Sequence, residues 1–250
     1  MNHNENDNDN DITEKLLPVT FNINSPKQIF INLTKEKKAF IFFILIIILT
    51  VGNNYYSFES FFSIPSIPKG FCYEDSLFTL TQTVTDFFKI HTKCKNALLI
   101  ISSFAADFTI IISMIYWTFF FKDEQLCISV FAFYLFRFVI MKIFLLDYPR
   151  DYIFTYPGVR SLFVSYLKTN DFFFSGHTGF PLIIFCDCIG KNYKKIAYLS
   201  LFTFIIEFFS MLALRGHYSI DLVVGAFIGI YVYFIVLVTL KYVKNNKIKS

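Results

Sequence analysis

The stretch "SIDLVVGAFIGIYVYFIVLVTL", residues 219–240, decides the fold class of this chain. After Asp221 it contains no charged residue, and as a helix rising about 1.5 Å per residue it can cross a hydrocarbon core of about 30 Å. The whole sequence has the same character, with 55% hydrophobic residues, 35 Phe, 15 Tyr and only 17% charged residues. Because soluble domains carry more charge and fewer apolar residues, we predict an all-α membrane protein.

Further apolar runs have the length of a membrane span. They cover residues 39–57, 97–121, 126–146, 173–190 and 196–215. Together with the opening stretch they predict a bundle of six transmembrane helices within residues 37–240. Residues 1–36 are rich in Asn and Asp and poor in large apolar side chains, which predicts a disordered tail. Residues 241–250 form a second, basic tail.

The placement of lysine predicts how this bundle is oriented. Lysines gather before the first run, in the loop 191–195 and after Leu240. The loops 58–96 and 147–172 instead balance basic with acidic residues. With six spans the three lysine-rich regions fall on one side, and an excess of Lys and Arg marks the cytosolic side. We therefore expect both tails to be cytosolic and the two balanced loops to be luminal or exterior.

Two polar clusters interrupt the apolar runs. The first is "DFFFSGHTGF", residues 171–180, and the second is "LRGHYSID", residues 214–221. His217 and Asp221 are four positions apart, so in a helix they share one face, where a carboxylate holds one imidazole tautomer and stabilises the protonated ring. An alternative interpretation is a helix start, in which Ser219 caps the helix and Asp221 is favourable in its first turn.

His177 and His217 are expected to lie at the same membrane surface. They are 40 positions apart, which corresponds to about 60 Å of helix, or two membrane crossings of about 30 Å. The lysine-rich loop 191–195 marks the turn between these crossings. Both histidines then reach the luminal surface together with Asp221 and Arg215. Burying ionisable residues at a membrane surface costs free energy, so residues that stay there usually have a function. We therefore predict a reactive pocket at this surface.

The two clusters carry a family resemblance. "FFFSGHTG" at 172–179 and "RGHYSIDLVVG" at 215–225 resemble the signature motifs of sphingomyelin synthases and of the plant phosphatidylcholine:diacylglycerol cholinephosphotransferases. Both groups belong to the type 2 phosphatidic acid phosphatase superfamily. The resemblance covers roughly residues 130–240, and "RGHYSIDL" is most similar to the plant transferases. It implies an enzyme that moves a phospho-head group, with phosphocholine expected, from a phospholipid to diacylglycerol or ceramide at the luminal face.

The resemblance also implies catalytic roles. The histidine at the position of His217 attacks the phosphorus and forms a phosphohistidine, and Asp221 orients it. The histidine at the position of His177 protonates the leaving diacylglycerol oxygen and later activates the acceptor hydroxyl.

The sequence departs from the wider superfamily at two basic positions. In place of its Ser-Arg pair ahead of the second histidine, the chain has Ser210-Met211. The lysine motif of the superfamily is a Lys six residues ahead of Arg-Pro. This chain has only Lys142 followed by Pro149-Arg150, in which the order of Arg and Pro is inverted. Both departures are features of the transferase branch. They argue against the alternative function, a lipid phosphate phosphatase that uses water as acceptor at the same site. For Lys142 and Arg150 the alternative role is snorkelling to the membrane interface.

The phosphate group therefore needs other partners. Arg137 is the first candidate, because it resembles the arginine in the third span of sphingomyelin synthases. Arg215 and Arg150 follow as candidates. Ser175 and Gly176 can add hydrogen-bond donors at a helix start.

Two acids, Asp107 and Glu207, fall inside predicted spans. Each can pair with Arg137 or Lys142 inside the bundle, because a charge within a span needs a partner. Glu207 can instead contact a choline cation or tune a histidine.

Other ligands are less consistent with the sequence. A membrane protein that binds haem through His177 and His217 is disfavoured, because a haem ligand needs no aspartate four positions further on. We expect neither a metal nor any other cofactor, and the five cysteines do not form a zinc set. Cys72 and Cys94 share the first luminal loop, where a disulfide between them is allowed. No basic and aromatic pattern indicates nucleic-acid binding.

The expected partners are the bilayer, a donor phospholipid and a diacylglycerol or ceramide acceptor. The chain is expected in the endomembrane system, at the endoplasmic reticulum or Golgi, or in the plasma membrane, with a role in phospholipid or sphingolipid metabolism. The sequence is compatible with choline, ethanolamine or inositol head groups and with any oligomeric state.

Overall fold

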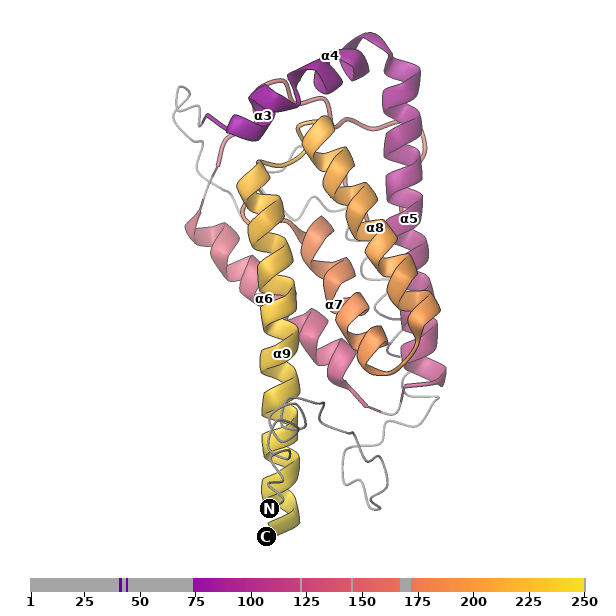
Figure 1. Ribbon diagram of the computed structural model, residues 1–250, viewed down its shortest axis with the longest axis vertical. Helices are drawn as coiled ribbons and strands as arrows, with labels where there is room; N and C mark the ends of the chain where they lie inside the picture. Colours follow the sequence, from indigo (N-terminus) through magenta and orange to yellow (C-terminus); the bar gives the residue numbers. More distant parts are fainter. Residues whose placement is uncertain are drawn as a thin grey trace, which may run out of the picture. The chain divides into compact units, whose positions relative to one another are not determined.

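The computed structural model describes residues 74–121, 123–144, 146–166 and 172–249, together with Ile41 and Ile44. This part of the chain consists of helices joined by loops and contains no β-strand (Figure 1). The predicted all-α class is therefore confirmed for the described residues.

Two short helices precede five longer ones. The short helices are α3 (Ser76–Leu80) and α4 (Gln82–Ile90). The longer helices are α5 (Thr92–Phe119), α6 (Gln125–Ile143), α7 (Gly176–Gly190), α8 (Lys194–Ala213) and α9 (Ser219–Lys249).

Within the part of the chain that the structure describes, three helices are long and apolar enough to cross a membrane. They are α5, α8 and the part of α9 from Ser219 to Asn246. A shorter apolar helix, Gln125–Met141, lies within α6. α7 has 15 residues, or about 22 Å of helix, which is less than the roughly 30 Å of a hydrocarbon core. The structure thus indicates a membrane protein, and the predicted six spans are not confirmed.

The predicted run 173–190 differs from α7 at its start. The helix begins only at Gly176, because Ser175 has an extended backbone, with φ −70° and ψ 123°, and forms the N-cap. At the other end of the chain, α9 continues as helix through the predicted basic tail to Lys249.

Some predictions fall outside the described residues. They concern the disordered tail 1–36, the first span 39–57 apart from Ile41 and Ile44, and Cys72. Cys94 is a free, exposed cysteine in the structure, so the predicted disulfide between Cys72 and Cys94 is not borne out.

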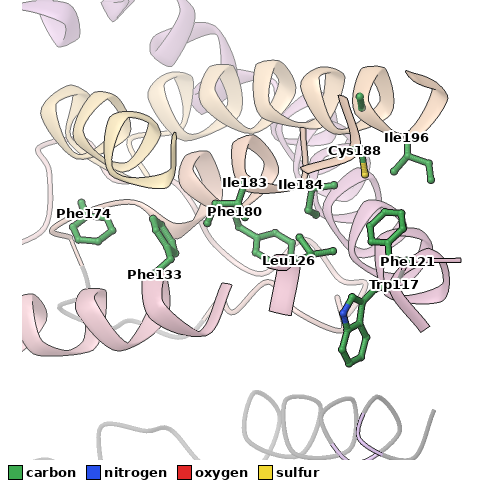
Figure 2. Packing of buried hydrophobic residues seen from close by; sticks show 11 residues of the cluster. Trp117, Phe121, Leu126, Phe133, Phe174, Phe180, Ile183, Ile184, Cys188 and Ile196 are labelled. Carbon is green, nitrogen blue, oxygen red and sulfur yellow. The ribbon is translucent and has the colours of Figure 1, made fainter. Parts of the chain in front are cut away.

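α7 is the central helix of the bundle. It packs against α5, α6, α8 and α9, and Figure 1 shows it between α8 and α9. Ile183 and Ile184 in its middle are completely buried. Figure 2 shows them in one apolar cluster with Phe133 and Leu126 of α6. The helix that begins with the first polar motif is thus held from all sides by apolar packing.

Glycines bring α7 and α9 into backbone contact. A Cβ added at Gly225 would lie 2.6 Å from Thr178 Oγ1, and one added at Gly229 would lie 2.5 Å from the Gly179 carbonyl oxygen. Small residues allow membrane helices to approach this closely. Hydrogen bonds join the same turns, because Thr178 Oγ1 donates to the Leu222 carbonyl at 2.9 Å. The first turns of α7 and α9, which carry the two polar motifs, therefore lie side by side.

Candidate active site

His217 and Asp221 face each other at the start of α9. His217 lies in the segment 214–218 between α8 and α9, and its Nδ1 is 3.6 Å from Asp221 Oδ2. The same carboxylate oxygen accepts a hydrogen bond from the backbone N–H of Tyr218 at 3.2 Å. Asp221 therefore supports the helix start, as a capping acid does, and lies next to the imidazole. Asp221 thus lies in the first turn of α9 and beside His217, although His217 itself lies outside the helix.

Ser219 differs from its predicted capping role. It is the first residue of α9, not the residue before it. Its backbone N–H and its hydroxyl both donate to the carboxylate of Asp75, at 2.6 Å and 2.8 Å. The acceptor for this helix start thus comes from the residue that precedes α3, far away in the sequence.

His177 is the second residue of α7 and lies next to Glu207 of α8. Its Nδ1 is 3.2 Å from Glu207 Oε2, and the side chain of Glu207 is only 1% exposed. Of the roles considered for Glu207, the structure brings it to a histidine and not to a basic partner of the bundle.

The two histidine–carboxylate pairs meet. The imidazole rings of His177 and His217 lie 5.8 Å apart between centroids. The side chain of His177 is 24% exposed, whereas that of His217 is 5% exposed. Phe154 stands 6.3 Å from the His177 ring and Phe172 stands 5.9 Å from the His217 ring. The result is a polar site with apolar walls, in which both rings turn Nδ1 toward a carboxylate.

Arg137 belongs to α6, and its side chain reaches the start of α7. Its Nε donates to the carbonyl oxygen of Phe174 at 2.8 Å, and a Cβ added at Gly176 would lie 3.6 Å from this Nε. Ser175 Oγ is buried and has no hydrogen-bond partner among the described residues. A helix N-terminus offers unpaired N–H groups that suit an anion. The structure thus brings three of the predicted phosphate-binding residues together next to His177.

Arg215 points away from the histidines. Its guanidinium donates to Thr81 Oγ1 at 2.9 Å, to the Phe78 carbonyl at 2.6 Å and to Gln82 Oε1 at 3.1 Å, and it stacks on the Phe78 ring. Burial lowers the pKa of this guanidinium. All these partners belong to α3, α4 and the turn between them, so the guanidinium of Arg215 is engaged by these elements and is not brought to the histidines.

The remaining candidates from the sequence add little to the site. Arg150 is exposed in the turn that follows α6, and the side chain of Lys142 lies outside the described part of the chain. Met211, at the superfamily position of an arginine, is 1% exposed and packs in an apolar cluster with Phe154.

Asp107 binds a loop, not a basic residue. Its carboxylate accepts from Ser161 Oγ at 2.8 Å and from the backbone N–H groups of Leu162 and Phe163 at 2.9 Å and 3.0 Å. It therefore fixes the loop 152–166, which supplies Phe154 to the site. Among the described residues, no cluster of three His, Cys, Asp or Glu side chains is arranged to hold a metal ion.

Comparison with known proteins finds a matching protein family. A family model described as AtPDCT1/2 matches residues 74–237. This range begins just before α3, ends in α9 and includes both polar motifs. Neither a curated protein nor a solved structure matches the chain.

Proposed function

The chain belongs to the phosphatidylcholine:diacylglycerol cholinephosphotransferase family, and we propose that it moves phosphocholine from phosphatidylcholine to diacylglycerol through a phosphohistidine. In this proposal the site faces the luminal side, because the placement of lysine along the sequence favours that orientation. The observation that carries the proposal is the pair of histidine–carboxylate couples whose rings lie 5.8 Å apart.

His217 is the nucleophile of the first half-reaction. Its Nδ1 faces Asp221 at 3.6 Å, so Nε2 is the ring atom left to attack the phosphorus. The P–N bond forms while the P–O bond to diacylglycerol breaks. The ring becomes a phosphorylated imidazolium, and the carboxylate of Asp221 offsets its positive charge.

His177 handles the protons. Its Nδ1 faces Glu207 at 3.2 Å, so the protonated ring gives its Nε2 proton to the leaving diacylglycerol oxygen. In the second half-reaction the neutral ring takes the proton from the acceptor hydroxyl. The acceptor oxygen attacks the phosphorus, the P–N bond breaks, and both histidines return to their starting protonation states.

Arg137, Ser175 and Gly176 bind the phosphate oxygens. The guanidinium lies beside the start of α7, and the Ser175 hydroxyl is a buried donor without a partner in the described structure. Donors fixed before the reaction begins are worth more than donors that must reorganise.

A lipid phosphate phosphatase is the alternative function. It would use the same histidines, with water in place of the acceptor hydroxyl. The apolar surroundings support the transferase, because Phe154 and Phe172 stand against the two histidine rings and Met211 fills the superfamily arginine position. Such a wall favours a lipid hydroxyl over water.

A labelled-acceptor assay tests the proposed function. The full chain is expressed in cells that lack the activity, and its membranes receive fluorescent diacylglycerol or fluorescent ceramide with phosphatidylcholine as donor. We expect fluorescent phosphatidylcholine. Fluorescent sphingomyelin alone would change the acceptor to ceramide. Release of inorganic phosphate from added phosphatidic acid, without a labelled lipid product, would assign a lipid phosphate phosphatase.

Replacing Arg137 is expected to weaken this transfer without abolishing it. Arg137→Ala should lower kcat/KM by about 10- to 100-fold, because charge-assisted hydrogen bonds contribute roughly 1.5–3 kcal/mol. Arg137→Lys should recover part of the loss, since it keeps the charge. Lys195→Ala, which changes an exposed lysine at the start of α8, is the matched control. An Arg137→Ala rate equal to that of the control would exclude the guanidinium from the site.

A further inference from the structure

We propose that Arg215 and Asp75 are positioning residues, which clamp the His217 segment onto α3 and α4. The proposal rests on the proposed role of His217 as nucleophile. It assigns Arg215 a different task from the phosphate contact that its place in the motif indicated. It also assigns a task to α3 and α4, which lie outside both motifs.

The backbone of Arg215 points to a function of its side chain. Its φ is 57°, in the left-handed region that costs conformational energy for any residue with a Cβ. A helix commonly ends with glycine in this conformation. Here α8 ends at Ala213, and an arginine takes the left-handed position although a glycine follows it. Such strain persists where the surroundings impose it.

The surroundings of Arg215 are the polar groups of α3 and α4. The side chain is completely buried. Both of its terminal nitrogens are used, Nη1 by Thr81 Oγ1 and Nη2 by the Phe78 carbonyl and Gln82 Oε1. These acceptors follow one another along the short helices, so a planar guanidinium binds them together as an ammonium group cannot.

A second anchor holds the other side of His217. Asp75 accepts from the N–H and the hydroxyl of Ser219, and it also accepts from the N–H of Leu77 at the start of α3. Phe78 adds a stacked contact with Tyr218, at 5.8 Å between ring centroids. His217 thus lies between two anchored residues: Arg215, two positions before it, and Ser219, two positions after it.

The clamp matters because the two histidines sit on different elements. His177 is fixed in the first turn of α7, whereas His217 lies outside the helices, in the segment 214–218 between α8 and α9. A displacement of about 1 Å at a reacting group can cost about 100-fold in rate. The anchors on α3 and α4 keep the 5.8 Å separation of the rings without touching the substrate.

The test compares Arg215→Lys and Ser219→Ala in the full-length chain. Each variant should lower kcat by about 10- to 100-fold while KM for phosphatidylcholine stays within about twofold. The control is Lys95→Ala, which removes an exposed hydrogen bond from α5 to Thr155 and leaves the segment untouched. Ser219→Ala keeps the experiment decisive if Arg215→Lys does not fold.

A double-mutant cycle separates positioning from phosphate binding. If Arg215 acts through α4, then Gln82→Ala should cost much less in the Arg215→Lys background than in the wild type. Additive losses, or a rise of KM with unchanged kcat, would assign Arg215 to the substrate and overturn the proposal.

A chemical measurement separates failure of the clamp from failure of the proposed function. Diethylpyrocarbonate modification of His217, followed by mass spectrometry, should become several-fold faster in both clamp variants and not in Lys95→Ala. An unchanged rate in the clamp variants overturns the clamp even if the wild type is an active transferase. A wild type without transfer activity overturns the proposed function, and the modification rates still report on the clamp.

Discussion

His217→Ala is expected to reduce phosphocholine transfer to the background of membranes without the enzyme. The reason is that His217 is the nucleophile of the proposed mechanism, in which His177, paired with Glu207, transfers protons instead. Loss of a covalent nucleophile typically costs on the order of 10⁶-fold in kcat. The measurement is the rate of labelled phosphatidylcholine formation, together with capture of an acid-labile, alkali-stable phosphorylated enzyme.

Asp221→Asn provides the graded comparison for His217→Ala. It removes the charge 3.6 Å from Nδ1 and keeps the shape of the side chain, so we expect a loss of about 10⁴-fold, as for the aspartate of the serine protease triad. Both proteins should elute as folded, membrane-inserted species. Transfer at a wild-type rate by folded His217→Ala would mean that the reaction needs no covalent step at this residue.

The helices of this chain were predictable where apolar periodicity and length dominate. The runs 196–215 and 219–240 correspond to α8 and to most of α9, because apolar residues prevail along both runs despite the single acids Glu207 and Asp221. The run 173–190 was too long, since hydrophobicity does not reveal that Phe173 and Phe174 precede the extended Ser175. Hydropathy therefore finds the helices better than it finds their starts.

The pairing within the site was only partly predictable. The i, i+4 spacing of His217 and Asp221 predicted their contact through a shared helix face. The structure makes that contact in another way, because His217 lies in the segment 214–218, before α9 begins, and its Nδ1 is 3.6 Å from Asp221 Oδ2. The contact between His177 and Glu207 joins two helices, and it depends on the packing of α7 against α8. The sequence could only indicate that a buried acid needs a partner.

Arg215 and Asp75 show where motif reasoning fails. Arg215 belongs to the motif by sequence, yet its left-handed backbone turns the guanidinium toward α3 and α4. Asp75 lies far outside the motif and contacts its centre through Ser219. Neither relation has a signal in local composition. Asp75 is only recognisable as an acid ahead of a short helix, where it also caps Leu77.

His177→Ala is expected to lower transfer from phosphatidylcholine by about 10²–10⁴-fold, because an alkoxide is a poor leaving group without a proton donor. Glu207→Gln should lower it by about 10²-fold, since the amide keeps the shape next to Nδ1 but not the charge that stabilises the imidazolium. If the two residues act as one unit, the double variant should be no slower than His177→Ala alone.

A donor with a better leaving group separates the two histidines by role. Nitrophenolate leaves without protonation, so His177→Ala should still release nitrophenol from p-nitrophenyl phosphocholine in a burst that forms the phosphorylated His217. His217→Ala should release none, because the P–N bond cannot form. Glu207→Gln should resemble His177→Ala with this donor, because its carboxylate acts only through the His177 ring at 3.2 Å. The opposite pattern, a burst in His217→Ala and none in His177→Ala, would exchange the two roles: the nucleophile would then be the 24% exposed His177 at the start of α7, and the 5% exposed His217 beside Asp221 would be the proton donor.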